Sequence, residues 1–594
     1  METPEEPCFG NASGNKRRER VLFWLGSILL ITSVPAFAEP SPTLILHHGK
    51  IVTVDAEFSI AEAIAVAEDR ILAVGSNDTI LALKRPETKV IDLEGKMLLP
   101  GLMDSHVHPS AAMTEFDHEI PVMETIADVL AFVSSRARAS QPGDLITVRQ
   151  VFITRLAERR YPTRAELDGA APANPVIFST GPDSMLNSLA MKLAGIDREF
   201  IVPEGQPGKV ETDPSTGEPT GLLRGLGVNV KASQSVKTPA PEDIYRRTAE
   251  LFHDYNSVGL TTVCDRDSNE DAVALYQKMR EQGDLTVRMR VSMGIPPLGL
   301  WPITEKAIDK IIQHPLRKPD PLLQIIGTKC YLDGGMLTGS AFMIDPWGVS
   351  KIYGITDPTY RGEQKIPTDR LRQLVVKVVK SGLQFTAHSV GDAAVQTLVD
   401  VYEDVNREFP IRDSRSSITH CNFMTPGSIE KAARLGITID MQPIWLHLDG
   451  ATLMQQFGNE RLSRFQPLRS LFDNHITVGG GSDHMQKIGS FRSVNAYNPW
   501  LGIQTAITRM ARNLDAPLHP ENVITRAEAI RLYTLNNARL LFLESETGSL
   551  EKGKLADMIL LDRDVLSCPA DQIRDTRVLT TWLAGRTLGS PVSK

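Results

Sequence analysis

The sequence predicts an α/β protein built around a TIM-type (β/α)8 barrel, and three features of the chain support this prediction. Eight short apolar segments of strand type run through the middle of the chain, with helical segments between most of them. Alternating strand segments separated by turn residues occupy both ends, at 43–97 and 548–588. The first and second barrel strands are separated by a stretch too long for one connection, at about 109–240. We therefore expect a barrel, a β-domain made from both chain ends, and an inserted subdomain after the first barrel strand.

The barrel strands and helices are predicted from hydrophobic periodicity. The strands are expected at 97–108, 260–264, 286–293, 325–332, 383–388, 417–420, 438–441 and 475–478. Helices are predicted at 241–257, 369–380, 392–406 and 428–435, where apolar residues recur at helical spacing. Eight β–α units at these spacings are typical of a TIM-type barrel.

The expected domain boundaries follow from this pattern. Residues 39–96 form the N-terminal part of the β-domain and residues 546–594 its C-terminal part. Residues 97–545 form the barrel, including the insertion.

Composition excludes some classes of protein. The chain has 594 residues, of which 42% are hydrophobic and 23% charged, as in ordinary soluble globular proteins. A net charge of -8 argues against a nucleic-acid partner. After loss of Cys8 with the N-terminal segment, four cysteines remain without a C-x-x-C motif. We expect free thiols, since a large core needs no disulfide framework.

The N-terminus has the layout of a secretory signal peptide. A basic cluster at 16–20 precedes an apolar run at 21–34, and Ala36-Phe-Ala38 forms an A-x-A cleavage site. We expect residues 1–38 to be removed, which predicts a secreted or periplasmic protein with no membrane span after cleavage. The alternative is an uncleaved membrane anchor.

Two histidines mark the C-terminal end of the first barrel strand. Side chains two positions apart on a strand share a face, so His106 and His108 project together. Two neutral imidazoles at this spacing supply half of a ligand set for a divalent transition metal. The alternative is a pair of packed or surface histidines.

Four further polar residues lie at the ends of other predicted strands, where barrels of this type place their chemistry. They are Lys329 on the fourth strand, His388 on the fifth, His420 on the sixth and Asp483 on the eighth. Taken singly, either histidine could be a buried residue bonded to a carbonyl, Lys329 could pair with Asp333, and Asp483 could cap a helix. Their occurrence together at successive strand ends favours a shared site.

Longer phrases around these residues resemble a known family. Gly327-Thr-Lys-Cys-Tyr-Leu-Asp-Gly-Gly, Thr386-Ala-His-Ser-Val-Gly-Asp, Gly480-Gly-Ser-Asp-His and Gly553-Lys-Leu-Ala-Asp resemble the amidohydrolase superfamily, in its branch containing N-substituted formamide deformylase. The similarity covers about 43–588. It implies a TIM barrel, a composite β-sandwich from both termini, and an enzyme that hydrolyses non-peptide C–N bonds.

The resemblance also implies a two-metal centre. His106, His108 and Asp483 would hold one divalent ion, and His388 and His420 the other, with a carboxylated Lys329 as the bridge. Zinc suits this mixture of nitrogen and oxygen ligands. A metal-bound water is acidified toward neutral pH and supplies the attacking hydroxide. Asp483 would act first as general base and then as general acid.

The substrate is expected to be a small molecule, and the candidate pocket residues come partly from the insertion. They are Asp183, Asn187, Trp347 and His484, together with Tyr497 and Trp500. The alternative is that these residues only pack the lid. Pro182 stands where the resemblance implies a histidine, and proline has neither a side-chain donor nor a metal-binding atom for the substrate contact that the resemblance implies there.

Two other functions remain open on the sequence alone. The same centre can serve an ester, lactone or phosphoester hydrolase. A catalytically inert metal-binding homologue is the other alternative, which the intact Asp483 disfavours. The oligomeric state does not follow from the sequence, and a homo-oligomer is compatible with it.

Overall fold

The computed structural model describes residues 41–588, apart from 150, 181–182, 204–205, 207, 228 and 234–237. The predicted signal peptide at 1–38 and Pro182 therefore lie outside the described residues. No helix in the described part of the chain is long and apolar enough to cross a membrane.

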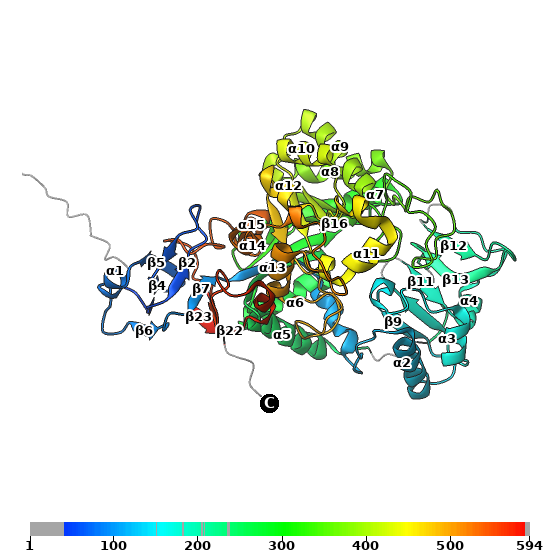
Figure 1. Cartoon of the computed structure of the whole chain (residues 1–594), viewed down its shortest axis with the longest axis horizontal. Coiled ribbons are helices and arrows are strands. Elements are labelled where there is room, and N and C mark those ends of the chain that lie inside the picture. Colours follow the sequence, from blue (N-terminus) through cyan, green and yellow to red (C-terminus); the bar gives the residue numbers. More distant parts are fainter. Residues whose placement is uncertain are drawn as a thin grey trace, which may run out of the picture. The chain divides into compact units, whose positions relative to one another are not determined.

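A barrel of eight parallel strands forms the centre of the fold (Figure 1). Neighbouring strands around the barrel follow the order β8 (Leu102–Val107), β14 (Leu260–Ser268), β15 (Arg288–Gly294), β16 (Leu323–Tyr331), β17 (Gln384–Ser389), β18 (Ser417–His420), β19 (Thr438–Met441) and β20 (Val478–Gly480). A parallel bridge between Val107 and His484 brings the two outer strands together. The predicted α/β barrel is confirmed.

Helices connect the strands and cover the barrel. They are α5 (Pro241–Ser257), α6 (Glu270–Gln282), α7 (Trp301–Ile312), α8 (Thr368–Lys380), α9 (Asp392–Glu408), α10 (Pro426–Leu435), α11 (Ile444–Leu462), α12 (Leu468–Asp473), α13 (Pro499–Thr508), α14 (Arg526–Leu532) and α15 (Leu535–Leu540). In α8 the buried residues Leu371, Leu374, Val375 and Val378 recur at helical spacing. This apolar stripe packs into the barrel core.

The last barrel strand differs from its prediction. We expected a strand at 475–478, whereas β20 begins at Val478. His475 follows the end of α12 with a φ of 56°, in the left-handed region. Because of the turn at His475, the strand begins only at Val478.

The predicted strand at 97–108 is two strands in two different sheets. β7 (Met97–Pro100) pairs with β2 (Lys50–Val52) and β21 (Met558–Leu561), whereas β8 belongs to the barrel. Gly101 separates them, and a Cβ added there would lie 2.2 Å from Oγ1 of Thr261. The strand pairing therefore changes at Gly101, where the chain passes too close to β14 for any side chain.

Two sheets are built from the ends of the described chain, and Figure 1 shows the N-terminal (blue) and C-terminal (red) strands together. One has the order β5-β4-β1-β6, with β5 (Arg70–Gly75), β4 (Ala63–Ala67), β1 (Leu44–His47) and β6 (Lys89–Asp92). The other has the order β23-β22-β21-β7-β2-β3, with β23 (Arg586–Leu588), β22 (Val578–Leu583) and β3 (Ile60–Ala61). Residues of both sheets, such as Leu46 and Met558, share one hydrophobic cluster.

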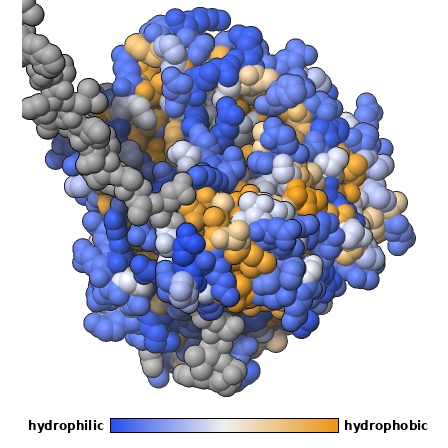
Figure 2. All heavy atoms as spheres, turned by 90° about the vertical axis from the view of Figure 1, so that its left-hand side faces the viewer, coloured by the Kyte–Doolittle hydropathy of each residue, from blue (hydrophilic) through white to orange (hydrophobic). Residues whose placement is uncertain are grey.

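The surface on this side of the molecule is mainly hydrophilic, with hydrophobic residues reaching it near the centre of the view (Figure 2). Large exposed hydrophobic residues on these strands include Ile60 on β3 and Leu579 on β22. The hydrophobic residues of the shared cluster are turned inward, which is how two small sheets become stable.

The insertion after β8 forms a separate five-stranded sheet in the order β12-β13-β11-β10-β9. Its elements are α2 (Ile126–Ala139), β9 (Ile146–Arg149), α3 (Arg164–Ala170), β10 (Val176–Ser179), β11 (Ser184–Leu186), α4 (Ser188–Ala194), β12 (Lys209–Thr212) and β13 (Pro219–Arg224). Phe178 of this sheet shares a hydrophobic cluster with Leu337 and Trp445, which follow barrel strands. The insertion therefore packs over the C-terminal ends of the barrel strands.

Candidate metal centre

The six predicted ligands meet at the C-terminal end of the barrel. His106 lies in β8 and His108 directly after it, Lys329 lies in β16, His388 in β17, His420 at the end of β18, and Asp483 after β20. The ring centroids of His106 and His420 are 5.0 Å apart, and those of His388 and His420 are 4.5 Å apart. Side chains from five strands thus face one small space.

One corner of this space has the spacing of a metal site. Nε2 of His106 lies 3.1 Å from Nε2 of His108, and Oδ1 of Asp483 lies 3.3 Å and 3.1 Å from these two nitrogens. Ligands bound tetrahedrally at about 2.0–2.2 Å from a cation are themselves about 3.3–3.6 Å apart. The three atoms are therefore close to the positions that a single divalent ion requires.

Hydrogen bonding orients the first histidine for metal binding. Nδ1 of His106 lies 3.0 Å from Oδ2 of Asp440, and both side chains are fully buried. Because an ionised carboxylate can only accept, Nδ1 of His106 carries the hydrogen. The lone pair is then on Nε2, the atom that faces His108 and Asp483.

The histidines on β17 and β18 are oriented in the same way. Nδ1 of His420 lies 2.7 Å from Oε1 of Gln442, and Nε2 of His388 lies 3.1 Å from the carbonyl oxygen of Gly334. Each ring donates one N–H to a fixed acceptor, so its other nitrogen is free to bind a metal.

Asp440 and Gln442 were not predicted as site residues. Asp440 lies in the predicted strand at 438–441, and Gln442 directly follows this strand. Because the two residues are two positions apart, their side chains share one face of the strand, which points to the centre of the barrel. The same alternation that identified His106 and His108 could have found them.

Lys329 has the environment that a carboxylated lysine needs. The side chain is fully buried, and Nζ has no hydrogen-bond partner among the described residues. Burial lowers the pKa of this amine, which favours the neutral form that reacts with carbon dioxide. An unpartnered buried amine beside metal ligands fits a site completed by a carbamate and cations.

Burial favours the neutral form of three of the four histidines. Burial holds the pKa values of His106, His388 and His420 well below the usual range. Against the effect of burial, the hydrogen bond with Asp483 raises the pKa of His108. Neutral imidazole is the form that binds a metal ion.

The backbone is strained at two of the ligands. His420 and Asp483 have φ angles of 73° and 55°, in the left-handed region that residues other than glycine seldom adopt. Such conformations cost about 1–3 kcal/mol and persist where the surrounding structure enforces them, often at functional sites.

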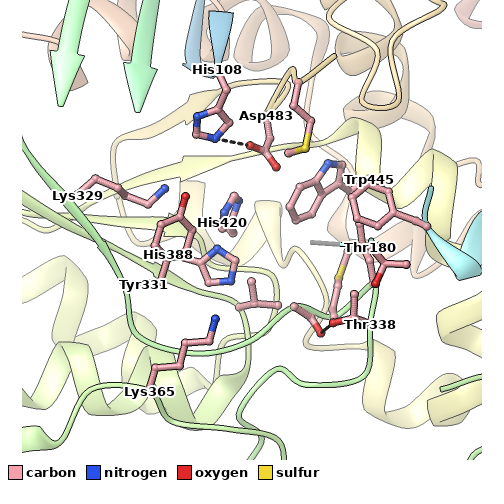
Figure 3. Close-up of a pocket in the computed structure, with 16 residues that line it drawn as sticks. His108, Thr180, Lys329, Tyr331, Thr338, Lys365, His388, His420, Trp445 and Asp483 are labelled. Atoms are coloured by element: carbon pink, nitrogen blue, oxygen red, sulfur yellow. Dashed lines mark hydrogen bonds and ion pairs between the residues drawn. The ribbon is translucent and has the colours of Figure 1, made fainter. Parts of the chain in front are cut away.

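A cavity of about 380 Å³ opens next to the cluster (Figure 3). It is lined by His108, Phe152, Thr180, Lys329, Tyr331, Gly335, Met336, Leu337, Thr338, Lys365, His388, Val390, His420, Trp445, Asp483 and Met485. Phe152 and Thr180 come from the insertion. Most of the remaining wall is apolar, as is usual for a small-molecule site. Apart from the ligands, sequence reasoning named none of these residues as site residues. Tyr331 and Gly335 lie in the phrase that begins at Gly327, whereas most of the others lie outside any motif.

Two predicted substrate contacts from the insertion do not line this cavity. Asp183 is fully buried and accepts hydrogen bonds from Arg224 and from the amide of Gly225. Asn187 caps α4, where Oδ1 accepts from the amide of Ala190. Both side chains form hydrogen bonds within the insertion, and neither is among the residues that line the cavity.

Trp347 and His484 are likewise outside the cavity lining. Nε1 of Trp347 donates to the carbonyl of Ala341, and the ring is buried among aromatic residues. The ring of His484 is fixed between the hydroxyl of Tyr255 and the carbonyl of Gln486. Tyr497 and Trp500, the other candidates, are also buried in the core. None of these four residues is among those that line the cavity, and all four are buried.

Comparison with known proteins identifies the class. The model of the amidohydrolase family matches residues 89–588. The chain therefore belongs to the amidohydrolase family, and its barrel and cluster of ligands define a metal-dependent hydrolase.

Individual relatives extend along nearly the whole chain. It is 29% identical over 555 residues to N-substituted formamide deformylase of Arthrobacter pascens, covering 91% of this chain and 97% of the relative. It is 28% identical over 563 residues to Protein LONG AFTER FAR-RED 3 of Arabidopsis thaliana, covering 92% and 91%. A solved structure of an uncharacterized metal-dependent hydrolase from Pyrococcus horikoshii has a TM-score of 0.63 at 19% identity, covering 89% of this chain and 99% of that one. The resemblance to the formamide deformylase branch is thus confirmed.

Proposed function

We propose that the protein hydrolyses the C–N bond of a small non-peptide amide. This substrate would resemble an N-substituted formamide and carry an apolar group on its nitrogen. The orientation of the histidines carries this proposal. His106, His388 and His420 each donate one ring N–H to a buried acceptor, which leaves one nitrogen apiece for metal binding. The similarity to N-substituted formamide deformylase supports the choice of bond.

The ligand set fits two divalent ions. His106, His108 and Asp483 would hold one ion, His388 and His420 the other, and carboxylated Lys329 would join them. The unpartnered amine of Lys329 supports this assignment, and zinc suits the ligands. When bound, the ions would acidify water and polarise the substrate carbonyl.

The contacts of Asp483 support a role in proton transfer. Oδ1 faces His106 and His108, while the amide group of Asn495 lies 3.3 Å from Oδ2 and donates at 2.8 Å to the backbone carbonyl of Asp483. Burial raises the pKa of the carboxyl group, which brings it nearer to the range of a general base. We assign to Asp483 the removal of a proton from water and its delivery to the leaving nitrogen.

The apolar wall of the cavity excludes water from the leaving group. Trp445 stacks on His420 with ring centroids 4.9 Å apart, and Leu337 and Met485 lie on the same lining. These side chains favour a hydrophobic substituent on the substrate.

A substrate panel on metal-analysed protein tests the proposal. We expect two divalent ions per chain and turnover of N-formyl or N-acyl amines. Turnover restricted to esters, lactones or phosphoesters would reassign the bond, and metal binding without turnover of any compound would indicate an inert homologue.

We also propose that the protein is exported and that cleavage after Ala38 produces the mature chain. The basic cluster, apolar run and A-x-A site support this. Fractionation of the producing cells and intact mass measurement would test it, and a retained N-terminus would contradict the cleavage.

A further inference from the structure

A second group of metal-ligand side chains lies outside the barrel, in the N-terminal sheet. His47 ends β1, His48 directly follows it, and Asp92 ends β6. One ring nitrogen of each histidine and one carboxylate oxygen of Asp92 lie within 4.8 Å of one another. None of the three residues lines the cavity beside the barrel ligands. The proposed hydrolysis therefore gives this group no role.

Strand pairing places the first histidine beside the carboxylate. β1 and β6 are neighbouring parallel strands, and His47 stands opposite Asp92 in their register. Residues that stand opposite each other on neighbouring strands project from the same side of the sheet. The amide of Leu93 donates to the carbonyl of His47 at 2.8 Å, which joins the two strands where they end. The spacing of His47 and Asp92 is thus set by the sheet itself.

The backbone turns the second histidine toward the same group. Consecutive residues of a regular strand point to opposite faces, which would separate the two rings. His48 instead has a φ of 49°, in the left-handed region, and its ring centroid lies 4.5 Å from that of His47. Its amide donates to Oδ1 of Asn77 at 2.8 Å, and its carbonyl accepts from the amide of Gly95 at 2.7 Å. These hydrogen bonds hold the turn that brings the imidazoles together.

The polar atoms of the group are only partly used by the protein. Nδ1 of His48 lies 2.9 Å from Oδ2 of Asp92, and Oδ1 of Asp92 accepts from the amide of Glu94 at 2.8 Å. No lysine or arginine in the described part of the chain forms an ion pair with Asp92. Nδ1 of His47 is buried and has no hydrogen-bond partner among the described residues. Because buried polar atoms are almost always bonded, this free nitrogen indicates a ligand.

We propose that His47, His48 and Asp92 bind one divalent transition-metal ion of the Zn²⁺ type, with water in the remaining coordination positions. Two imidazoles and a carboxylate are a ligand set that zinc accepts. Ligand atoms around one zinc ion lie about 3.3–3.6 Å apart. The side chains of His48 and Asp92 are 53% and 50% exposed, so they are free to rotate until the three ligand atoms reach that spacing.

The ion would tie an edge strand to its neighbour. β6 is the outer strand in the order β5-β4-β1-β6, and β1 is the only strand of this sheet that pairs with it within the described residues. A cation that binds only the folded arrangement of His47, His48 and Asp92 stabilises that pairing. This site is independent of the proposed hydrolysis, and its test does not require turnover.

Counting bound zinc tests the site. After equilibration with micromolar free zinc, we expect the wild-type protein to retain one ion more than His47→Phe or His48→Gly, whatever the occupancy of the barrel cluster. Phenylalanine fills the place of the imidazole on a strand, and glycine accepts the left-handed backbone at position 48. His253→Phe, at an exposed position on α5, is the matched control and should retain the wild-type number. Equal numbers in all four proteins would overturn the proposal.

Chemical modification locates the ion in the wild-type protein without any substitution. Diethyl pyrocarbonate acylates free imidazoles, and peptide mass spectrometry reads the peptide with His47 and His48 and the one with His253 in the same sample. We expect micromolar zinc to protect the first peptide and to leave His253 reactive. No protection of the pair, protection that needs millimolar zinc, or equal protection of His253 would overturn the proposal. Protection of the pair in protein without hydrolase activity would support the site and count only against the proposed function.

Discussion

Oδ1 of Asp483 lies 3.1 Å from Nε2 of His108, which joins the end of the last barrel strand to the end of the first. This contact places the proposed proton carrier at the edge of the ligand cluster, with its side chain lining the cavity.

Replacing Asp483 with asparagine should therefore separate chemistry from binding. Asn keeps an oxygen for the cation and loses the basic group, so we expect retained metal and a fall in kcat of about 10²- to 10⁴-fold. Elemental analysis and steady-state kinetics measure the two effects. An unchanged kcat would remove Asp483 from the mechanism.

Asp440→Asn should weaken metal binding without removing a ligand. The substitution removes the carboxylate that fixes the tautomer of His106, and losses of this kind reduce metal affinity about 10- to 100-fold. Competition with a chelator measures the affinity. Asp369→Asn, at an exposed position on α8, is the control. Equal affinity in the two variants would show that Asp440 does not orient the ring.

Metal removal should reveal the carbamate. If Lys329 is carboxylated, protein stripped of metal should recover activity faster when zinc is returned together with bicarbonate than with zinc alone. Lys329→Met should bind less metal and show no response to bicarbonate. Native mass spectrometry can detect the added carboxyl group. Full recovery in carbon dioxide-free buffer would argue against the carbamate.

Gly101→Ala should destabilise the protein. The new Cβ would lie 2.2–2.8 Å from side-chain atoms of Thr261, and overpacking of this kind costs about 1–3 kcal/mol. Gly169→Ala, within α3 and with open space around the new Cβ, is the control. We expect the unfolding temperature to fall for the first variant and to stay level or rise for the second, because alanine favours helix. Equal temperatures would contradict the close approach at Gly101.

The N-terminus of α3 should lose stability in acid. Hydrogen bonding from Arg160 lowers the pKa of Glu166 from 4.5 to about 2, and Glu166 also accepts from the amide of Thr163. Because the folded-state pKa is the lower one, the stabilisation is complete above about pH 4.5 and is lost as the pH falls toward 2. Hydrogen exchange should therefore differ between wild type and Glu166→Gln at neutral pH, and this difference should shrink over that interval. A constant difference would assign the effect to packing.

Strand ends were the informative part of the sequence. His106, His108, Lys329, His388 and His420 could be placed from alternation and strand order alone, because a barrel brings the C-terminal ends of its strands together. The substrate residues could not be placed in this way. Their positions depend on how loops fold over the barrel, so the conspicuous residues Trp347 and Asn187 do not line the cavity, whereas Leu337 and Trp445, which carried no local signal, do line it.

The separation of β7 from β8 at Gly101 could not be predicted from the sequence either. The apolar run from Met97 onward reads as one buried strand, since nothing in hydrophobicity separates a strand of one sheet from that of the next. Only the approach of Thr261, which is distant in sequence, requires glycine at that point.

Pairing between the chain ends has a consequence for biosynthesis. The side chains of Lys50 and Asp564 meet across 514 residues, and β7 lies against β21. While the chain is being made, the apolar strand β7 has no partner in β21 until residues 558–561 have left the ribosome. The sheet that begins before the barrel in sequence is thus completed only after all eight barrel strands have been made, so the nascent chain stays incompletely folded throughout the synthesis of the barrel.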